Sequence, residues 1–252
     1  MKFFLILAVI SLVPLIEGER VMVISPHPDD GEIFCGGTIL YCEYRGVNVV
    51  EVFVTSGGAS STTAKSMDPE TLREEEALRV TQAFGVDETE FLHFPDGKIE
   101  VNETTETALK EIIKKYDPDI IYAPEFKDPF YRHSDHIAVG AMVDSIASNV
   151  RFYDYALKPG DSPVYVDVTE FLAEKNALLH GYESQRVIIT QATKLLPIVY
   201  ALNGFLAGKP LRYCEGFREK RSDNAEGCLG LSSSGFFRQS KMVRLISPQK
   251  EP

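Results

Sequence analysis

Two short segments hold most of the side chains in this chain that could perform chemistry. His27-Pro28-Asp29-Asp30 places an imidazole beside two adjacent carboxylates, and His133-Ser134-Asp135-His136 adds two imidazoles three positions apart. Three of the five histidines of the chain fall in these two segments. Zinc in hydrolases commonly takes three nitrogen or oxygen ligands from the protein and leaves one position for water. Either segment alone is a weak motif, but together they indicate a metal-assisted hydrolysis site.

The carboxylates of Asp29 and Asp30 can have different catalytic roles in such a site. Asp29 and Asp30 are adjacent, so in an extended segment their side chains point in different directions. One of them can bind the metal while the other faces a water molecule on it, which sets a base beside a Lewis acid. The spacing does not decide which aspartate has which task.

Three further polar side chains are weaker candidates. His93 precedes Phe94-Pro95 at the end of an expected strand, and we expect it to pack or to lie on the rim rather than bind metal. His180 falls within an amphipathic segment, where we expect a partly buried face and at most a place on the rim. Arg73 is either a solvated helix residue that makes i,i+4 ion pairs or, near the start of its helix, a residue that reaches the rim.

The segments that must position these side chains alternate between strand and helix. Short apolar, β-branched runs predict strands, and periodic segments bounded by caps predict helices. The expected strands are 21–25, 47–55, 90–93, 119–123, 152–156 and 164–167, and the expected helices are 33–44, 69–84, 104–116, 133–149, 169–184 and 190–206. This order predicts an α/β fold with a Rossmann-like, mostly parallel sheet and helices on both faces.

The polar loops follow the ends of four expected strands, at 26–32, 56–61, 95–98 and 124–136. Ligands bind beyond the carboxyl ends of the strands in such sheets, so both histidine segments are expected to meet at one rim. Gly36-Gly37 is expected to let the first helix approach the sheet closely. Residues 26–37 contain neither the dinucleotide-binding glycine pattern nor a phosphate-loop lysine, which disfavours a nucleotide-binding protein.

The N-terminus differs from the rest of the chain. Met1-Lys2 precedes an apolar run at 3–16, which has the length of a signal-peptide core and is short for a membrane span. We expect a cleaved signal peptide, with an uncleaved anchor or a first core strand as alternatives, and hence a protein of the secretory pathway that is secreted rather than anchored in the endoplasmic reticulum. The expected parts are residues 1–18 as signal peptide or anchor, 19–221 as one α/β domain, and 222–252 as a tail or added hairpin.

Composition, cysteine positions and one sequon indicate which binding partners and covalent modifications are expected. The net charge of −11 argues against nucleic acid, and we expect membrane contact only through the N-terminal segment. Cys35 and Cys42 are expected to be small buried residues, whereas Cys214 and Cys228 could form a disulfide in an oxidising compartment. Asn102-Glu103-Thr104 is either a glycosylation sequon or a helix N-cap followed by its first turn. The oligomeric state cannot be derived from the sequence.

The run from Pro26 to Thr38, Pro-His-Pro-Asp-Asp-Gly-Glu-Ile-Phe-Cys-Gly-Gly-Thr, resembles the signature of the LmbE-like/PIG-L family of zinc N-deacetylases. The segment 133–136 is similar to the second motif of that family. Weaker similarities in the same order extend the resemblance over residues 20–220, and they are Arg73-Glu74-Glu75, Phe94-Pro95-Asp96-Gly97, Ser184-Gln185 and Glu215-Gly216-Phe217. The chain departs from the family pattern at Gly31 and Ser134, and neither change is expected to disturb a metal site.

The resemblance implies catalytic roles at matching positions. The zinc ligands are matched by His27, Asp30 and His136, and Asp29 matches the general base. His133 matches a histidine that stabilises the tetrahedral intermediate or protonates the amine, with Asp135 as its orienting partner.

The resemblance also implies a substrate. Arg73 and Tyr131 match substrate-binding residues, and Asp96 is a weaker candidate for a contact with a sugar hydroxyl. The implied activity is removal of the N-acetyl group from an N-acetylglucosamine-containing glycan, glycoside or glycolipid, with Zn²⁺ as cofactor. The alternatives are a metal-dependent amidohydrolase acting on a non-sugar amide and a non-catalytic secreted carbohydrate-binding protein. The intact set of acid, base and metal ligands argues against the second alternative.

Overall fold

The structure is a computed structural model that describes residues 19–59, 67–127, 129, 131–147, 150–158, 161–162 and 164–220. The expected signal peptide at 1–18, the polar loop at 60–66 and the expected tail from 222 lie outside the described residues, and so does Cys228. The expectations about the leader, the domain boundaries and a Cys214–Cys228 disulfide therefore stay predictions.

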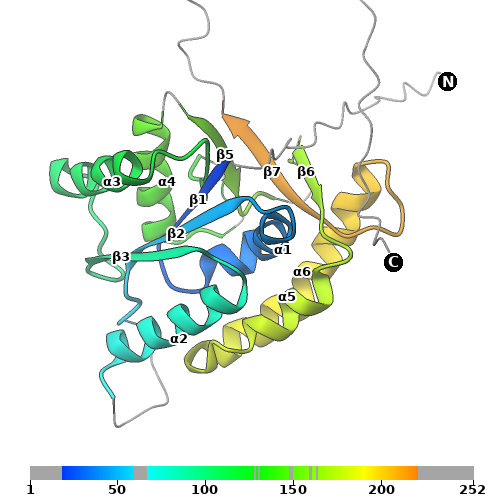
Figure 1. The fold of residues 1–252 in the computed structure, drawn as a ribbon, viewed down its shortest axis with the longest axis horizontal. Coiled ribbons are helices and arrows are strands. Elements are labelled where there is room, and N and C mark those ends of the chain that lie inside the picture. The colour runs from blue at the N-terminus through cyan, green and yellow to red at the C-terminus, as the bar shows by residue number, and fades with distance from the viewer. Residues whose placement is uncertain are drawn as a thin grey trace, which may run out of the picture. The chain divides into compact units, whose positions relative to one another are not determined.

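A seven-stranded sheet forms the centre of the described chain (Figure 1), in the order β3-β2-β1-β4-β5-β7-β6. The strands from β3 to β5 run parallel, and β7 is antiparallel to both β5 and β6. The predicted α/β fold with a mostly parallel sheet is thereby confirmed. The strands are β1 Arg20–Ser25, β2 Asn48–Thr55, β3 Glu88–Phe94, β4 Ile120–Pro124, β5 Arg151–Tyr155, β6 Val164–Asp167 and β7 Cys214–Lys220.

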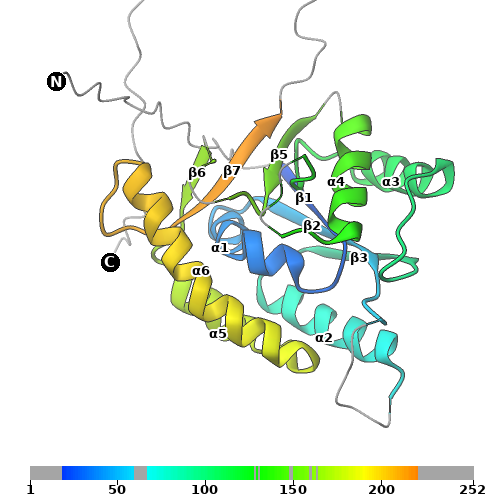
Figure 2. The same ribbon diagram turned by 180° about the vertical axis from the view of Figure 1, so that it is seen from behind.

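Helices cover both faces of the sheet, as predicted (Figures 1 and 2). One apolar core joins the sheet to α1, α2, α5 and α6, and a second core joins the opposite face to α3 and α4. The helices are α1 Asp30–Tyr44, α2 Pro69–Ala83, α3 Glu103–Tyr116, α4 Ser134–Ile146, α5 Leu172–Leu179 and α6 Arg186–Leu206, with a short 3₁₀ helix at Glu183–Gln185. No helix in the described part of the chain is long and apolar enough to cross a membrane.

Local signals set the helix ends where capping chemistry is strong. The Asp68 side chain accepts a hydrogen bond from the backbone N–H of Thr71, and Pro69 opens α2. Asn102 caps α3 as expected, through a reciprocal capping box with Thr105. Cys35 and Cys42 are buried, in agreement with the expectation from their spacing.

Three boundaries differ from the sequence expectation. The helix expected over 169–184 is reduced to α5 and the 3₁₀ turn, and α6 begins at Arg186 rather than near 190. Helix α4 ends at Ile146, three residues before the expected end. Strand β7 was not expected at all, because Cys-Glu-Gly-Phe-Arg-Glu-Lys is polar and has a central glycine. Pairing with β5 on one side and β6 on the other overrides that weak local preference.

Three close contacts at glycines fix the two helices that carry the histidine segments. A Cβ at Gly140 would lie 2.2 Å from the carbonyl oxygen of Pro124, so α4 packs directly on the end of β4. In α1, a Cβ at Gly37 would lie 2.6 Å from Cβ of Val168, and one at Gly36 would lie 2.9 Å from the ring of Phe84. A close approach is thus present at Gly36-Gly37, but it is made mainly to the segments that cover α1, and the sheet contributes only the Glu215 side chain of β7 at 3.0 Å from a Cβ at Gly37.

Candidate active site

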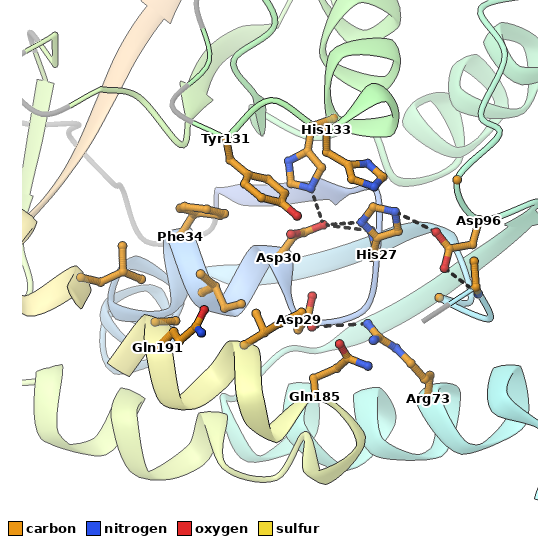
Figure 3. Close-up of a pocket in the computed structure, with 18 of the residues that line it drawn as sticks. His27, Asp29, Asp30, Phe34, Arg73, Asp96, Tyr131, His133, Gln185 and Gln191 are labelled. Atoms are coloured by element: carbon orange, nitrogen blue, oxygen red, sulfur yellow. Dashed lines mark hydrogen bonds and ion pairs between the residues drawn. The ribbon is translucent and has the colours of Figure 1, made fainter. Parts of the chain in front are cut away.

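A cavity of about 490 Å³ opens at the carboxyl ends of the parallel strands, where both histidine segments meet (Figure 3). Strand β1 ends at Ser25 and leads directly into the first segment, while the second segment begins α4 after β4. Their side chains form one wall of the cavity, and α6 forms the opposite wall. The convergence predicted from strand order is therefore present. The cavity residues that carry the chemistry are His27, Asp29, Asp30, Arg73, Asp96, Tyr131, His133 and His136.

Three donor atoms converge at the floor of this cavity. His27 Nδ1 lies 3.1 Å from Asp30 Oδ2, and His136 Nε2 lies 3.1 Å from the same oxygen. Asp30 and His136 are buried, yet neither ring nitrogen of His136 makes a hydrogen bond within the described residues. Two imidazoles and a carboxylate with ligand atoms within 4.8 Å of one another fit the donor set and spacing of a zinc site. The unsatisfied nitrogens of His136 are what such a site leaves when only the protein atoms are counted.

The electrostatics of the site favour a bound cation. Burial alone would lower the pKa of His27, but hydrogen bonds to Asp135, Asp30 and Asp96 raise it to about 12. Burial acts to raise the pKa of Asp30, but the nearby charge of His136 and the charge and hydrogen bond of His27 hold it well below its usual range. The carboxylates thus stabilise positive charge at the point where the three donor atoms meet.

A second pair of carboxylates holds the far side of the His27 ring. His27 Nε2 lies 3.1 Å from Asp96 Oδ1 and 3.3 Å from Asp135 Oδ2. Asp135 also accepts hydrogen bonds from the backbone N–H groups of Gly97, at 2.7 Å, and Ile99, at 3.4 Å. A carboxylate on the second nitrogen of a ligating histidine fixes the ring orientation, which leaves Nδ1 directed at Asp30.

The contacts of Asp135 reach both histidines and bear on the choice between two possible metal sites. Asp135 was expected to orient His133, and its backbone N–H donates to His133 Nδ1, at 3.3 Å, while its carboxylate is directed at His27. His27, His133 and Asp135 also form a possible metal-binding group. Because two backbone N–H groups already engage Asp135, we favour the group of His27, Asp30 and His136 as the metal site.

Asp29 occupies a strained and buried position beside the donor atoms. It precedes α1 with φ of 119°, in a region that residues other than glycine rarely adopt. Burial raises the pKa of Asp29 to about 7, against the lowering effect of the nearby Arg73. A carboxylate poised near neutral pH is suited to accept and release a proton. Backbone strain at such a position is a feature of functional sites.

Arg73 holds the Asp29 loop from α2. Its side chain is only 3% exposed, which excludes the solvated helix position that the sequence left open. Arg73 Nη2 donates to the carbonyl oxygen of Pro28 and lies 3.4 Å from Asp29 Oδ2 (Figure 3). Gly57, with φ of +72°, makes room for the guanidinium, since a Cβ there would lie 2.6 Å from Nε of Arg73.

Tyr131 and His133 lie over the mouth of the cavity. Their rings stack with centroids 6.0 Å apart, and Tyr131 also contacts His136 edge-on at 5.0 Å. The hydroxyl of Tyr131 points toward Asp30 in Figure 3. Burial and the nearby charge of His27 lower the pKa of His133, which favours the neutral ring, and its Nδ1 accepts the hydrogen bond from the Asp135 backbone N–H.

The two remaining histidines lie outside this constellation. His93 is exposed and contacts Ser56 and Glu74 at 3.1 Å each, in agreement with a place on the rim. His180 was expected on a partly buried helix face, and this is wrong: it is exposed at the end of α5, because the helix stops there, and it does not line the cavity.

One wall of the cavity was not anticipated from the sequence. Phe34 of α1 and side chains of α6 line it opposite the metal-binding side (Figure 3). The motif residue Gln185 also lines the cavity, although no role was assigned to it. The only sequence signal for this wall was the apolar character of α6, which is equally typical of a core helix. The α6 residues in the wall are Ile188, Gln191, Ala192, Leu195 and Leu196.

Comparisons with known proteins agree with this geometry. Residues 22–147 match the PIG-L family, described as GlcNAc-PI de-N-acetylase. A diacetylchitobiose deacetylase from Thermococcus kodakarensis is 30% identical over 196 residues, covering 68% of this chain and 72% of that protein. A probable N-acetyl-alpha-D-glucosaminyl L-malate deacetylase 2 from Bacillus anthracis is 27% identical over 199 residues, covering 71% of this chain and 86% of that protein.

Solved structures share the fold. The N,N'-diacetylchitobiose deacetylase from Pyrococcus horikoshii superposes with a TM-score of 0.71 at 25% identity, covering 81% of this chain and 84% of that one. A 4-carboxy-2-hydroxymuconate hydratase from Pseudomonas putida superposes with a TM-score of 0.69 at 17% identity, covering 86% of this chain and 99% of that one. The same fold is thus found in a protein named for a different reaction, so the site must decide the chemistry.

Proposed function

The chain belongs to the PIG-L family, and from that premise and its site geometry we propose that it is a zinc-dependent hydrolase that removes the N-acetyl group from an N-acetylglucosamine-containing substrate. The relatives that match it are named as deacetylases of diacetylchitobiose and of a glucosaminyl malate. The observation that carries the proposal is the placement of buried Asp29 directly beside the three converging donor atoms.

The donor set assigns the metal-binding role to His27, Asp30 and His136. Zinc held there would supply Lewis-acid polarisation of the acetamide carbonyl and of a water molecule. Asp96 and Asp135 orient the His27 ring from behind, and the backbone of Asp135 orients His133. These residues therefore position the reacting groups before substrate enters.

Asp29 is the general base of the proposed reaction. Its carboxylate accepts the proton of the attacking water, and its raised pKa lets it release that proton again near neutral pH. Neutral His133 hydrogen-bonds to the oxyanion that develops on the acetamide, and the leaving amine takes up the proton that Asp29 removed from water. Tyr131 lies beside His133 at the mouth and is placed to contact the acetyl group. Arg73 keeps the Asp29 loop in position from the buried side and so influences binding indirectly.

The proposal is tested by Asp29→Asn, which preserves the shape of the side chain and removes the base. We expect acetate release from N,N'-diacetylchitobiose to fall by about 10²–10⁴-fold while zinc binding is retained. Asp161→Asn, at an exposed aspartate away from the cavity, is the matched control and should leave turnover unchanged. Near-normal turnover of Asp29→Asn would overturn the assignment of the base.

The substrate class is tested with the same assay. N-acetylglucosamine, its oligomers and a set of N-acetylated non-sugar amines are compared for released acetate, with and without chelator. Turnover confined to the non-sugar amines would favour the alternative of a different amidohydrolase. Zinc binding without turnover of any compound would favour a carbohydrate-binding protein.

A further inference from the structure

The outer side of α6 exposes an unusual row of large apolar side chains. Val187, Ile198 and Phe205 are 73%, 67% and 68% exposed, although a helix of a globular protein normally turns such residues inward. Helix α6 runs along the outside of the fold in both views (Figures 1 and 2). Exposed contiguous apolar patches mark interaction surfaces. We call this surface the α6 face, and it consists of Val187, Ile188, Leu195, Ile198, Leu202, Phe205 and Leu206.

The charges on α6 are all of one sign. The helix has no acidic residue, while Arg186 and Lys194 are exposed and make no ion pair within the described chain. Beyond its end, Lys209 and Arg212 lie near Asp167, so they contribute less free positive charge. The whole chain has a net charge of −11, so an apolar helix whose charged side chains are all basic differs in charge from the rest of the protein. This combination is typical of helices that lie in the interface of an anionic lipid layer.

The α6 face is continuous with the active-site cavity. Ile188 and Leu195 are 48% and 61% exposed and also line the cavity wall. A second copy of the chain or another protein seated across this face would cover the mouth. A lipid layer would instead present amphiphilic molecules to it, because their polar heads project from the surface. The geometry therefore favours a lipid occupant over a protein occupant.

We propose that the α6 face docks on an anionic lipid surface and brings the mouth of the cavity against it. Membrane contact was expected only through the N-terminal segment, and α6 offers a separate contact that is built into the folded domain. The consequence for substrate choice rests on the proposed function: the enzyme would act preferentially on N-acetylated glycosides whose apolar part is held in a lipid layer.

Docking is tested with a single fluorescent reporter, since the chain contains no tryptophan. Phe205→Trp places the reporter on the α6 face, and Val101→Trp places it at an exposed apolar position directly before the N-cap of α3, a helix that lies across the sheet from α6 (Figure 1). On addition of phosphatidylglycerol–phosphatidylcholine vesicles, we expect a blue shift of emission for Phe205→Trp and none for Val101→Trp. The shift should be weaker with phosphatidylcholine alone and at high salt.

Three outcomes would overturn the proposal. The absence of any shift for Phe205→Trp would show that the face does not enter the lipid. Emission that is already blue-shifted without vesicles and does not change with protein concentration would indicate that another segment of the chain covers the face. A concentration-dependent shift without vesicles, with self-association in sedimentation, would indicate a second copy as the occupant.

The link to turnover is tested with Ile198→Gln/Phe205→Gln, because neither side chain lines the cavity. We expect at least about tenfold lower acetate release from an alkyl N-acetylglucosaminide embedded in anionic vesicles, and unchanged release from N,N'-diacetylchitobiose in solution. Equal activity of the variant and the unmodified protein on the embedded substrate would overturn the inference. If the unmodified protein releases acetate from neither substrate while Phe205→Trp still responds to vesicles, the proposed function fails and the docking surface stands.

Discussion

Two buried polar clusters lie along α1, and they differ in how completely their groups are paired. Near the middle of the helix, Lys175 Nζ donates to Glu215 Oε1 at 2.6 Å, to the Ile33 carbonyl oxygen at 2.8 Å and to the Tyr200 hydroxyl at 2.7 Å. Glu215 also accepts hydrogen bonds from the backbone N–H groups of Gly37 and Thr38. Every donor of the ammonium and both oxygens of the carboxylate are satisfied by the protein.

In the cluster at the start of α1, one member is not satisfied by protein atoms. His136 is buried with both ring nitrogens lacking a hydrogen bond in the described chain, and His27 and Asp30 face it at close range. A native structure rarely leaves buried polar groups without a partner, so the two clusters have different explanations. The Lys175–Glu215 cluster joins α1, α5, α6 and β7 into one unit, whereas the other cluster has the donor set of the metal site that we propose.

A third buried pair shows why an unpaired atom alone does not indicate a cation site. Glu32 and Glu51 are both buried behind the Asp29 loop, and neither oxygen of Glu51 has a hydrogen-bond partner among the described residues. Burial raises the pKa of Glu32 to about 7 and that of Glu51 well above its usual range, and the Glu32 carboxyl raises the pKa of Glu51 further. The raised pKa values mean that Glu32 and Glu51 favour the protonated, neutral form. The carboxylates around His27 instead stabilise a positive charge.

Among the predictions, removal of one charge from the fully hydrogen-bonded Lys175–Glu215 cluster has the largest expected effect on stability. Lys175→Met leaves Glu215 as a buried charge without its counter-ion, and we expect the free energy of unfolding to fall by about 3–5 kcal/mol, measured by urea denaturation. The double variant Lys175→Met/Glu215→Gln leaves no lone charge and should cost less than the single variant. A double variant that is less stable than Lys175→Met would contradict the pairing as described.

The unsatisfied cluster should respond to zinc, and the paired one should not. Added to chelator-treated protein at about 100 times its dissociation constant, zinc is expected to raise the free energy of unfolding by about 3 kcal/mol. His136→Gln should lose most of this gain, since one of the three ligands is removed. Lys175→Met, although less stable, should keep the full gain and thus serves as the control. An equal response of His136→Gln and the unmodified protein would place the metal elsewhere.

The smallest expected effect separates backbone strain at Asp29 from its chemistry. Asp29→Gly and Asp29→Ala both remove the carboxylate, but only glycine adopts φ of 119° without strain. Asp29→Gly should therefore be more stable than Asp29→Ala by about 1 kcal/mol in thermal or urea unfolding, with both inactive. Equal stability of the two variants would show that the backbone at this position is not strained.

Much of the fold was predictable because it rests on local signals. The first four strands, the capped helices α2 and α3 and the meeting of both histidine segments at one rim followed from periodicity, capping residues and strand order. Strand β7 was missed, since its residues have little preference for a strand and acquire one only between β5 and β6. The end of α5 was misjudged although a local signal is present, since Gly181 directly follows the C-cap residue His180.

The sequence by itself determined which side chains could carry chemistry, because a metal site needs particular residue types and those types are few in this chain. It also determined that they share an edge of the sheet, because parallel strands end on the same side. Only the tertiary structure decided that the carboxylate of Asp135 holds His27, that Arg73 is buried beside Asp29, and that one side of α6 remains exposed. Those outcomes depend on contacts between residues far apart in the chain, and local sequence does not encode the distance between them.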